Sequence, residues 1–147
     1  MRQISNDEIE ERAERAKELF SKGFNCSQAV VAACADLYDI PSDTALKMSA
    51  SFGGGIGRMR LTCGAACGMF VLAGLENGNT QPEQPKAKAE NYALVQRLAD
   101  KFVEANGDLV CGNLLGLNGT PPMQKRPCKE MVAEAVRIYL RIVRNNE

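Results

Sequence analysis

The sequence contains no histidine and no tryptophan among its 147 residues. Without histidine there is no imidazole to act as a general base, to activate a serine or cysteine nucleophile, or to bind zinc. The 18 lysines and arginines balance the 18 aspartates and glutamates, so the formal net charge is zero. Proteins that bind nucleic acids usually carry a surplus of basic side chains, and this balance therefore argues against a nucleic-acid partner.

Long hydrophobic segments are also missing. The longest predominantly apolar run, residues 65–75, contains Gly68 and Gly74 and is shorter than the roughly 20 apolar residues that span a bilayer. The first residues are mostly charged, so no secretory signal is predicted. We therefore expect a cytoplasmic protein without membrane insertion. The length predicts a single domain that comprises residues 1–147.

Signals for helices recur along the whole chain, whereas no segment alternates between apolar and polar residues with a period of two. Six segments have helical spacing: from Ser5 to Gly23, from Asn25 to Pro41, from Ser42 to about Ala50, from Cys63 to about Glu76, from the prolines at 82 and 85 to Gly107, and from Cys128 onward. The Cys63–Glu76 segment is apolar on every side, which is typical of a buried helix. The sequence thus predicts an all-α, single-domain bundle of about six helices around this central helix. Such an apolar helix is also compatible with a homodimer.

Four of the six cysteines occupy positions that favour chemistry. Cys26, Cys63 and Cys128 each fall in the first turn of a predicted helix. Free backbone N–H groups and the positive end of the helix dipole favour a thiolate there, and the thiolate is both the nucleophile and the metal ligand. Cys111 begins a stretch rich in glycine and proline, residues 111–127, which is predicted to be irregular. In a reducing cytoplasm such cysteines are metal ligands, redox thiols or small core residues more often than permanent disulfides.

The other two cysteines carry weaker signals. Cys34 lies in the middle of a predicted helix on its apolar face, so we expect an inert core residue. Cys67 follows Cys63 by one helical turn. That spacing fits core packing and a fifth thiol beside the other four equally well.

A glycine-rich segment between the third and fourth predicted helices comprises Gly53, Gly54, Gly55, Gly57, Arg58 and Arg60. Its spacing does not match the G-x-G-x-x-G fingerprint, no predicted strand precedes it, and no Walker motif follows, which argues against a nucleotide site. The glycines favour a sharp bend or a close approach to another helix. The alternative is an anion- or cofactor-binding nest in which the two arginines lie beside backbone N–H groups.

Together these motifs resemble a known family. Phe52-Gly53-Gly54-Gly55-Ile56-Gly57-Arg58-Met59, followed by Cys63-Gly64-Ala65-Ala66-Cys67-Gly68, is similar to the C_GCAxxG_C_C family of redox-active proteins. The resemblance extends from the first predicted helix to the last and matches Cys26, Cys63, Cys111 and Cys128 to the four characteristic cysteines. It assigns nothing to Cys34 or Cys67. The pattern is also distantly similar to the cysteine-bearing domain of split-Soret cytochromes, which holds an iron–sulfur centre, although no C-x-x-C-H haem motif occurs here.

Two hypotheses of function follow. In the first, the four cysteines converge as dithiol/disulfide pairs or as ligands of an iron–sulfur cluster or zinc, and an unidentified redox partner exchanges electrons with them. The cluster is favoured over thioredoxin-like exchange because the chain has no C-x-x-C and an all-thiolate set suits iron–sulfur or zinc. The glycine-rich segment would close around the site, and Arg58 would offset its negative charge. In the second, the chain is a non-enzymatic helical interaction domain whose cysteines serve mainly for packing.

Overall fold

The computed structural model describes residues 3–147, and within that range it contains α-helices, two short 3-10 helices and no strand. The all-α prediction is therefore confirmed. In chain order the elements are α1 (Asn6–Ser21), α2 (Cys26–Cys34), η1 (Ala35–Tyr38), α3 (Ser42–Ser49), η2 (Ala50–Phe52), α4 (Gly64–Asn77), α5 (Pro85–Asn106), α6 (Cys111–Leu115) and α7 (Cys128–Asn145). No helix in the described part is both long enough and apolar enough to cross a bilayer.

The helix starts are fixed by the side chains that the sequence indicates. The Ser5 hydroxyl accepts a hydrogen bond from the backbone N–H of Glu8 at 3.1 Å. Asn25 and Gln28 form a complete capping box, in which each side chain accepts the other residue's backbone N–H, at 2.9 and 3.1 Å. Because this box holds the first turn of α2 rigidly, it also fixes the position of Cys26, the first residue of that helix.

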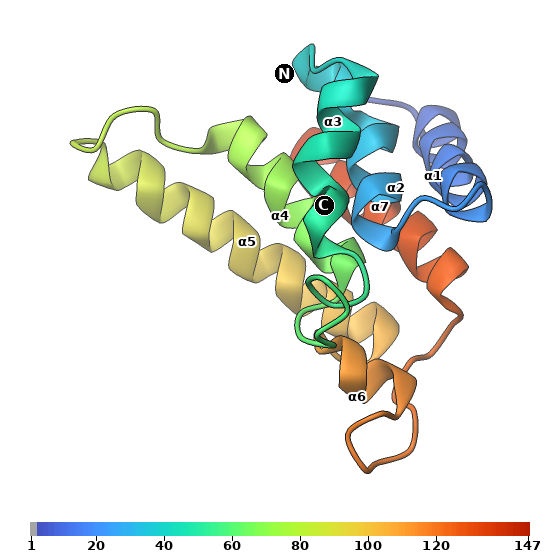
Figure 1. The fold of residues 1–147 in the computed structure, drawn as a ribbon. Coiled ribbons are helices and arrows are strands. Elements are labelled where there is room, and N and C mark those ends of the chain that lie inside the picture. Colours follow the sequence, from blue (N-terminus) through green and yellow to red (C-terminus); the bar gives the residue numbers. More distant parts are fainter. Residues whose placement is uncertain (1–2) are drawn as a thin grey trace.

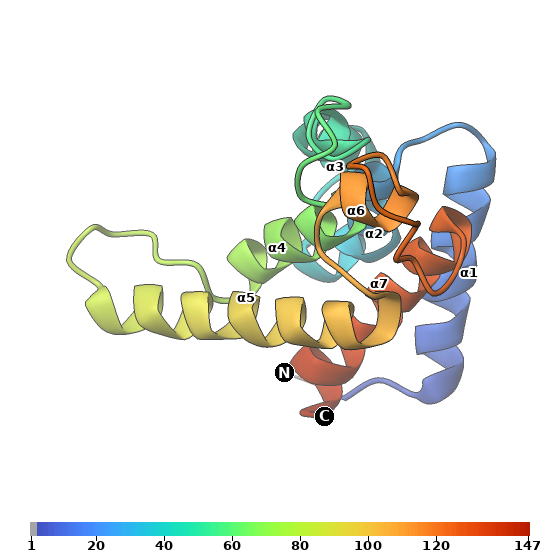
Figure 2. The same ribbon diagram turned by 90° about the horizontal axis from the view of Figure 1, so that it is seen from below.

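The helix predicted to be central lies in the middle of the molecule. α4 packs against α2, α5 and α7, while α1 lies along α7 and α2 (Figure 1). Seen from below, α5 runs across the view and extends past the other helices toward the loop before it (Figure 2). The first residues of α2, α4 and α7 gather near α6 and the loop that precedes α4.

Hydrogen bonds near the C-terminal ends fix α4 against its neighbours. The Tyr139 hydroxyl of α7 donates to the Leu72 carbonyl of α4 at 2.9 Å. The Tyr38 hydroxyl of η1 donates to Glu76 of α4 at 2.7 Å, and its oxygen lies against the Tyr139 hydroxyl oxygen. Since these residues are largely buried, the bonds restrict sliding of α7 along α4 and so help to position the opposite ends of both helices.

The close approach of α2 to α4 depends on a glycine. A Cβ atom added at Gly68 would lie 2.9 Å from Cβ of Val30 and 3.2 Å from the carbonyl oxygen of Ser27. By contrast, a Cβ at Gly74, in the same helix, would meet no atom within 4 Å. The two glycines therefore provide a matched pair in which only the first is required by packing.

We expect Gly68→Ala to lower the free energy of unfolding by about 1–3 kcal/mol, because the added methyl group would push α2 away from α4. Gly74→Ala should instead raise it by up to about 1 kcal/mol, because alanine has the higher helix propensity. Urea denaturation followed by circular dichroism measures both changes. Equal effects of the two substitutions would show that the α2–α4 contact is not tight at Gly68.

Candidate functional site

The four cysteines singled out by the sequence all lie at helix starts. Cys26 and Cys128 are the first residues of α2 and α7, and Cys63 is the N-cap of α4. Cys111 is the first residue of α6. The prediction of an irregular segment there was wrong for residues 111–115. A five-residue helix next to several glycines and prolines is too short to produce a periodic pattern.

These four side chains line one cavity of about 50 Å³. Its other walls come from the loop before α4 and from the first turns of α4, α6 and α7, and comprise Gly54, Gly55, Arg60, Gly64, Leu114, Leu115 and Met131. Cys63 and Cys111 are buried, whereas Cys26 and Cys128 are partly exposed. All six cysteines of the chain are present as free thiols. The cavity thus joins two accessible thiols and two buried ones.

A short antiparallel contact brings Cys63 and Cys111 to the same cavity. Thr62 pairs with Val110, and two backbone hydrogen bonds flank that pair. The N–H of Cys63 donates to Leu109 O at 2.7 Å, and the N–H of Cys111 donates to Leu61 O at 2.6 Å. Because the two segments are hydrogen-bonded through the backbone, the starts of α4 and α6 are held side by side. No side-chain pattern in the sequence signals this pairing.

The loop before α4 has an unusual backbone. Residues 54–58 all have left-handed φ angles, between 57° and 72°, including the β-branched Ile56. Such a conformation is rare for residues other than glycine and is retained only where the surrounding structure enforces it. Gly55 is required for a second reason, because a Cβ atom there would lie 2.6 Å from Cβ of Cys111. The glycine-rich segment therefore makes a sharp bend that closes one side of the cavity.

Cys26 and Cys128 line the same cavity, and their pKa values shift in opposite directions. The hydrogen bond from the Cys26 thiol lowers the pKa of Cys128 to about 6, and the positive charge of Arg60 contributes in the same direction. The same bond, together with burial, raises the pKa of Cys26 well above its ordinary value. Cys128 is thus the thiol that ionises first, while Cys26 keeps its proton and stabilises the thiolate.

The buried cysteines differ from this pair. Burial raises the pKa of Cys63 to about 12, although the backbone N–H groups of Ala65 and Ala66 at the start of α4 act in the opposite direction. The Arg60 guanidinium donates to Sγ of Cys111 at 3.7 Å. Arg60 is therefore the cation that faces the cysteines.

The sequence profile of a family described as "Putative redox-active protein (C_GCAxxG_C_C)" matches residues 24–142, which is most of the chain. The chain belongs to this family. A protein of Archaeoglobus fulgidus, described as "Uncharacterized protein", is 31% identical over 142 residues. The match covers 91% of this chain and 94% of the archaeal protein. No solved structure matches the sequence.

Neither of the other two cysteines of this C_GCAxxG_C_C protein lines the cavity. Cys34 is completely buried in the hydrophobic core, and burial raises its pKa to about 12. The Cys67 thiol donates to the carbonyl oxygen of Thr62 at 3.9 Å, and burial raises its pKa as well. Of the two roles that the sequence left open for Cys67, the structure therefore favours core packing, because the residue is buried and does not line the cavity.

The glycine-rich segment contributes unequally to the cavity. Gly54 and Gly55 line it, whereas Gly53, Gly57 and Arg58 line a neighbouring open hollow. The sequence proposed Arg58 as the charge beside the cysteines, but the structure places Arg60 there. The difference arises because the left-handed turn sends successive side chains in different directions, which residue spacing alone does not reveal.

The arrangement of the four cysteines shows whether they could bind a metal centre. Four cysteines are a suitable set for an iron–sulfur cluster or zinc. Yet within residues 3–147 no group of three or more Cys, His, Asp or Glu side chains is arranged so that it could hold a metal ion. Cys26 and Cys128 shift each other's pKa in opposite directions, while Cys111 accepts a hydrogen bond from Arg60. As arranged here, the cysteines therefore fit a pair of interacting thiols better than a set of metal ligands.

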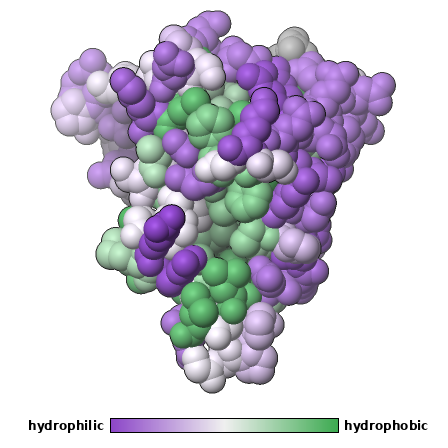
Figure 3. Space-filling view, turned by 45° about the vertical axis from the view of Figure 1, so that its right-hand side comes forward, coloured by the Kyte–Doolittle hydropathy of each residue, from purple (hydrophilic) through white to green (hydrophobic). Residues whose placement is uncertain are grey.

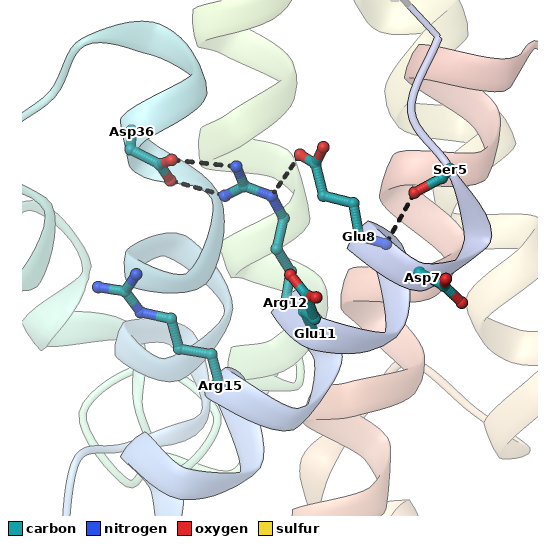
Figure 4. Close-up of a pocket in the computed structure, with 7 residues that line it drawn as sticks. All are labelled: Ser5, Asp7, Glu8, Glu11, Arg12, Arg15 and Asp36. Atoms are coloured by element: carbon teal, nitrogen blue, oxygen red, sulfur yellow. Dashed lines mark hydrogen bonds and ion pairs between the residues drawn. The ribbon is translucent and has the colours of Figure 1, made fainter.

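A larger hollow of about 520 Å³ lies elsewhere, between the start of α1 and η1 (Figure 4). Arg12 donates to both carboxylate oxygens of Asp36, at 2.7 and 3.0 Å, and to Glu8 at 3.1 Å. It also donates to the carbonyl oxygen of Ala33. These bonds join α1 to the end of α2 and to η1, so we assign this polar hollow a structural role.

Large exposed hydrophobic side chains occur on both segments that flank the cysteine cavity. Met59 and Leu61 belong to the loop before α4, and Leu117 and Met123 belong to the segment after α6. Figure 3 shows hydrophobic side chains in the central and lower parts of this face, whereas hydrophilic ones cover most of its right-hand side. Exposed hydrophobic side chains therefore lie on both segments beside the cavity.

Proposed function

We propose that this protein is a thiol redox protein in which Cys26 and Cys128 alternate between a dithiol and a disulfide. The observation that carries the proposal is that Cys26 and Cys128 line one cavity, where their interaction lowers the pKa of Cys128 to about 6 and raises that of Cys26. A thiol with a pKa of about 6 is about nine-tenths ionised at pH 7. Membership of a family described as redox-active supports the same conclusion.

The exchange has two steps. The Cys128 thiolate attacks one sulfur of a substrate disulfide, a new sulfur–sulfur bond forms, and one substrate thiolate leaves and takes a proton from water. Cys26 then loses its proton and attacks the Cys128 sulfur, which releases the second substrate thiol and leaves a Cys26–Cys128 disulfide. Two electrons pass from the protein to the substrate. A second dithiol, as the reductant, would restore the pair by the reverse exchange.

Other groups of the cavity support this reaction. The Arg60 charge lowers the pKa of Cys128 and so stabilises the attacking thiolate. Cys63 and Cys111 are buried and form the wall behind the pair. We assign this chemistry to the cytoplasm, where the reducing environment would regenerate the dithiol.

A redox titration tests the proposal. Anaerobically purified protein, equilibrated with mixtures of reduced and oxidised dithiothreitol, should undergo one two-electron transition. Cys26→Ser and Cys128→Ser should each abolish the transition, while Cys34→Ala should retain it because Cys34 lies in the core away from the cavity. Bound iron or zinc that protects the four cysteines would contradict the proposal in favour of a metal site. Six thiols that do not respond to the oxidant would favour an interaction domain.

A further inference from the structure

We propose that the open hollow beside the cysteine cavity binds the anionic part of a small disulfide substrate and so presents its sulfur–sulfur bond to Cys128. This inference rests on the proposed function of Cys26 and Cys128 and adds the class of substrate. The hollow has a volume of about 340 Å³, within the range of small-molecule binding sites. It is lined by Asn25, Ala50, Gly53, Gly54, Gly57 and Arg58.

The hollow and the cysteine cavity are neighbours. Gly54 lines both of them, and Asn25, which lines the hollow, immediately precedes Cys26. The Asn25 side chain donates to the carbonyl oxygen of Ala50 at 2.9 Å, so this wall of the hollow is tied to the start of α2. A molecule held in the hollow would therefore lie next to the redox pair.

Apart from the Cys128 thiolate, the charged side chains around the two spaces are positive. Arg58 lines the hollow and Arg60 lines the cavity, and no aspartate or glutamate lines either of them. Within residues 3–147, Arg58 makes no hydrogen bond or ion pair to another side chain, so its guanidinium is free to bind a ligand. An arginine binds a carboxylate or sulfonate through paired N–H donors.

Arg58 is also held near the cavity by the backbone of the loop. The Cγ atom of Arg58 lies 2.8 Å from the position that a Cβ atom on Gly54 would occupy. The stem of the arginine thus crosses directly over the glycine that separates the hollow from the cavity. Arg58 is therefore a cation without a side-chain partner that lies beside the cavity of Cys26 and Cys128.

The cavity and the hollow are too small to hold a large substrate. The cavity of about 50 Å³ admits only a few atoms, and the hollow of about 340 Å³ accepts one small polar group and its chain. An anionic disulfide would place its carboxylate at Arg58, whereas a cationic disulfide would bring a like charge to the same point. The reaction remains the balanced exchange described above, in which the substrate disulfide accepts two electrons and is released as two thiols.

Three small disulfides of different charge test this inference: oxidised glutathione, which is anionic, 2-hydroxyethyl disulfide, which is neutral, and cystamine, which is cationic. The oxidation rate of the protein dithiol by each is divided by the rate of the same disulfide with free 2-mercaptoethanol. We expect the normalised rate with oxidised glutathione to exceed that with cystamine at least about tenfold at low ionic strength, and added salt to reduce the difference.

Arg58→Gln should bring the two normalised rates to within about threefold of each other, mainly by slowing the oxidation by oxidised glutathione. Arg97→Gln, in an exposed position of α5, is the matched control and should change none of the rates. Equal rates in the wild type, or a selectivity that survives Arg58→Gln, would overturn the inference while the proposed function stands. Failure of all three disulfides to oxidise the pair would overturn both.

Discussion

Cys128→Ser is expected to lower the alkylation rate of the most reactive thiol about 100-fold at pH 7. A thiol with a pKa of about 6 is mostly ionised at this pH, whereas one with a pKa of about 12, such as Cys63, is ionised to about one part in 10⁵. The greater intrinsic nucleophilicity of the less acidic thiol offsets part of this ratio. Iodoacetamide labelling of the native protein, resolved by peptide mass spectrometry, measures the rate at each cysteine.

The matched control for this substitution is Cys34→Ala. Cys34 is completely buried, and burial raises its pKa to about 12, so its loss should leave the fastest alkylation rate unchanged. A fast-reacting thiol that persists in Cys128→Ser would identify another cysteine as the nucleophile and contradict the assignment.

Cys26→Ala is expected to raise the pKa of Cys128 from about 6 toward the ordinary thiol value of about 8.5. The reason is that the largest cause of the low pKa is the hydrogen bond donated by the Cys26 thiol. In the wild type, the alkylation rate of Cys128 should rise with pH, reach half its maximum near pH 6 and level off at about pH 7. In Cys26→Ala the plateau should move to higher pH, and the rate at pH 6 should fall about tenfold after correction for nucleophilicity.

Cys26→Ser tests whether a hydrogen-bond donor at position 26, and not merely a side chain of similar size, lowers the pKa of Cys128. A serine hydroxyl is also a donor, so this variant should keep the midpoint of the pH profile closer to that of the wild type. If Cys26→Ala and Cys26→Ser shift the midpoint equally, the hydrogen bond is not the cause of the low pKa.

The sequence predicts the fold well because the signals are local. Ser5 and Asn25 begin helices as their capping patterns indicate, and the apolar segment after Cys63 becomes the central helix. These features depend on residues within one or two turns of each other. The short helix that starts at Cys111 was missed because five residues cannot display a helical period.

The candidate site was only partly predictable. Helix-start positions pointed to Cys26, Cys63 and Cys128, and the glycine- and proline-rich stretch pointed to Cys111. The family resemblance then matched all four. The arrangement inside the site depends on contacts between distant segments, such as the bond from Cys26 to Cys128 and the bond from Arg60 to Cys111. No local pattern contains that information. The left-handed turn at residues 54–58 likewise places Arg60 beside the cysteines, where Arg58 was expected.

Disulfide mapping of the oxidised protein tests whether Cys26 and Cys128 form the redox pair. Anaerobically purified, fully reduced protein is treated with one equivalent of oxidant, the remaining thiols are blocked at low pH, and the peptides are identified by mass spectrometry. We expect one main disulfide, between Cys26 and Cys128, with Cys34, Cys63, Cys67 and Cys111 alkylated as free thiols after unfolding. A main disulfide that joins any other two cysteines, or no intramolecular disulfide, would contradict it.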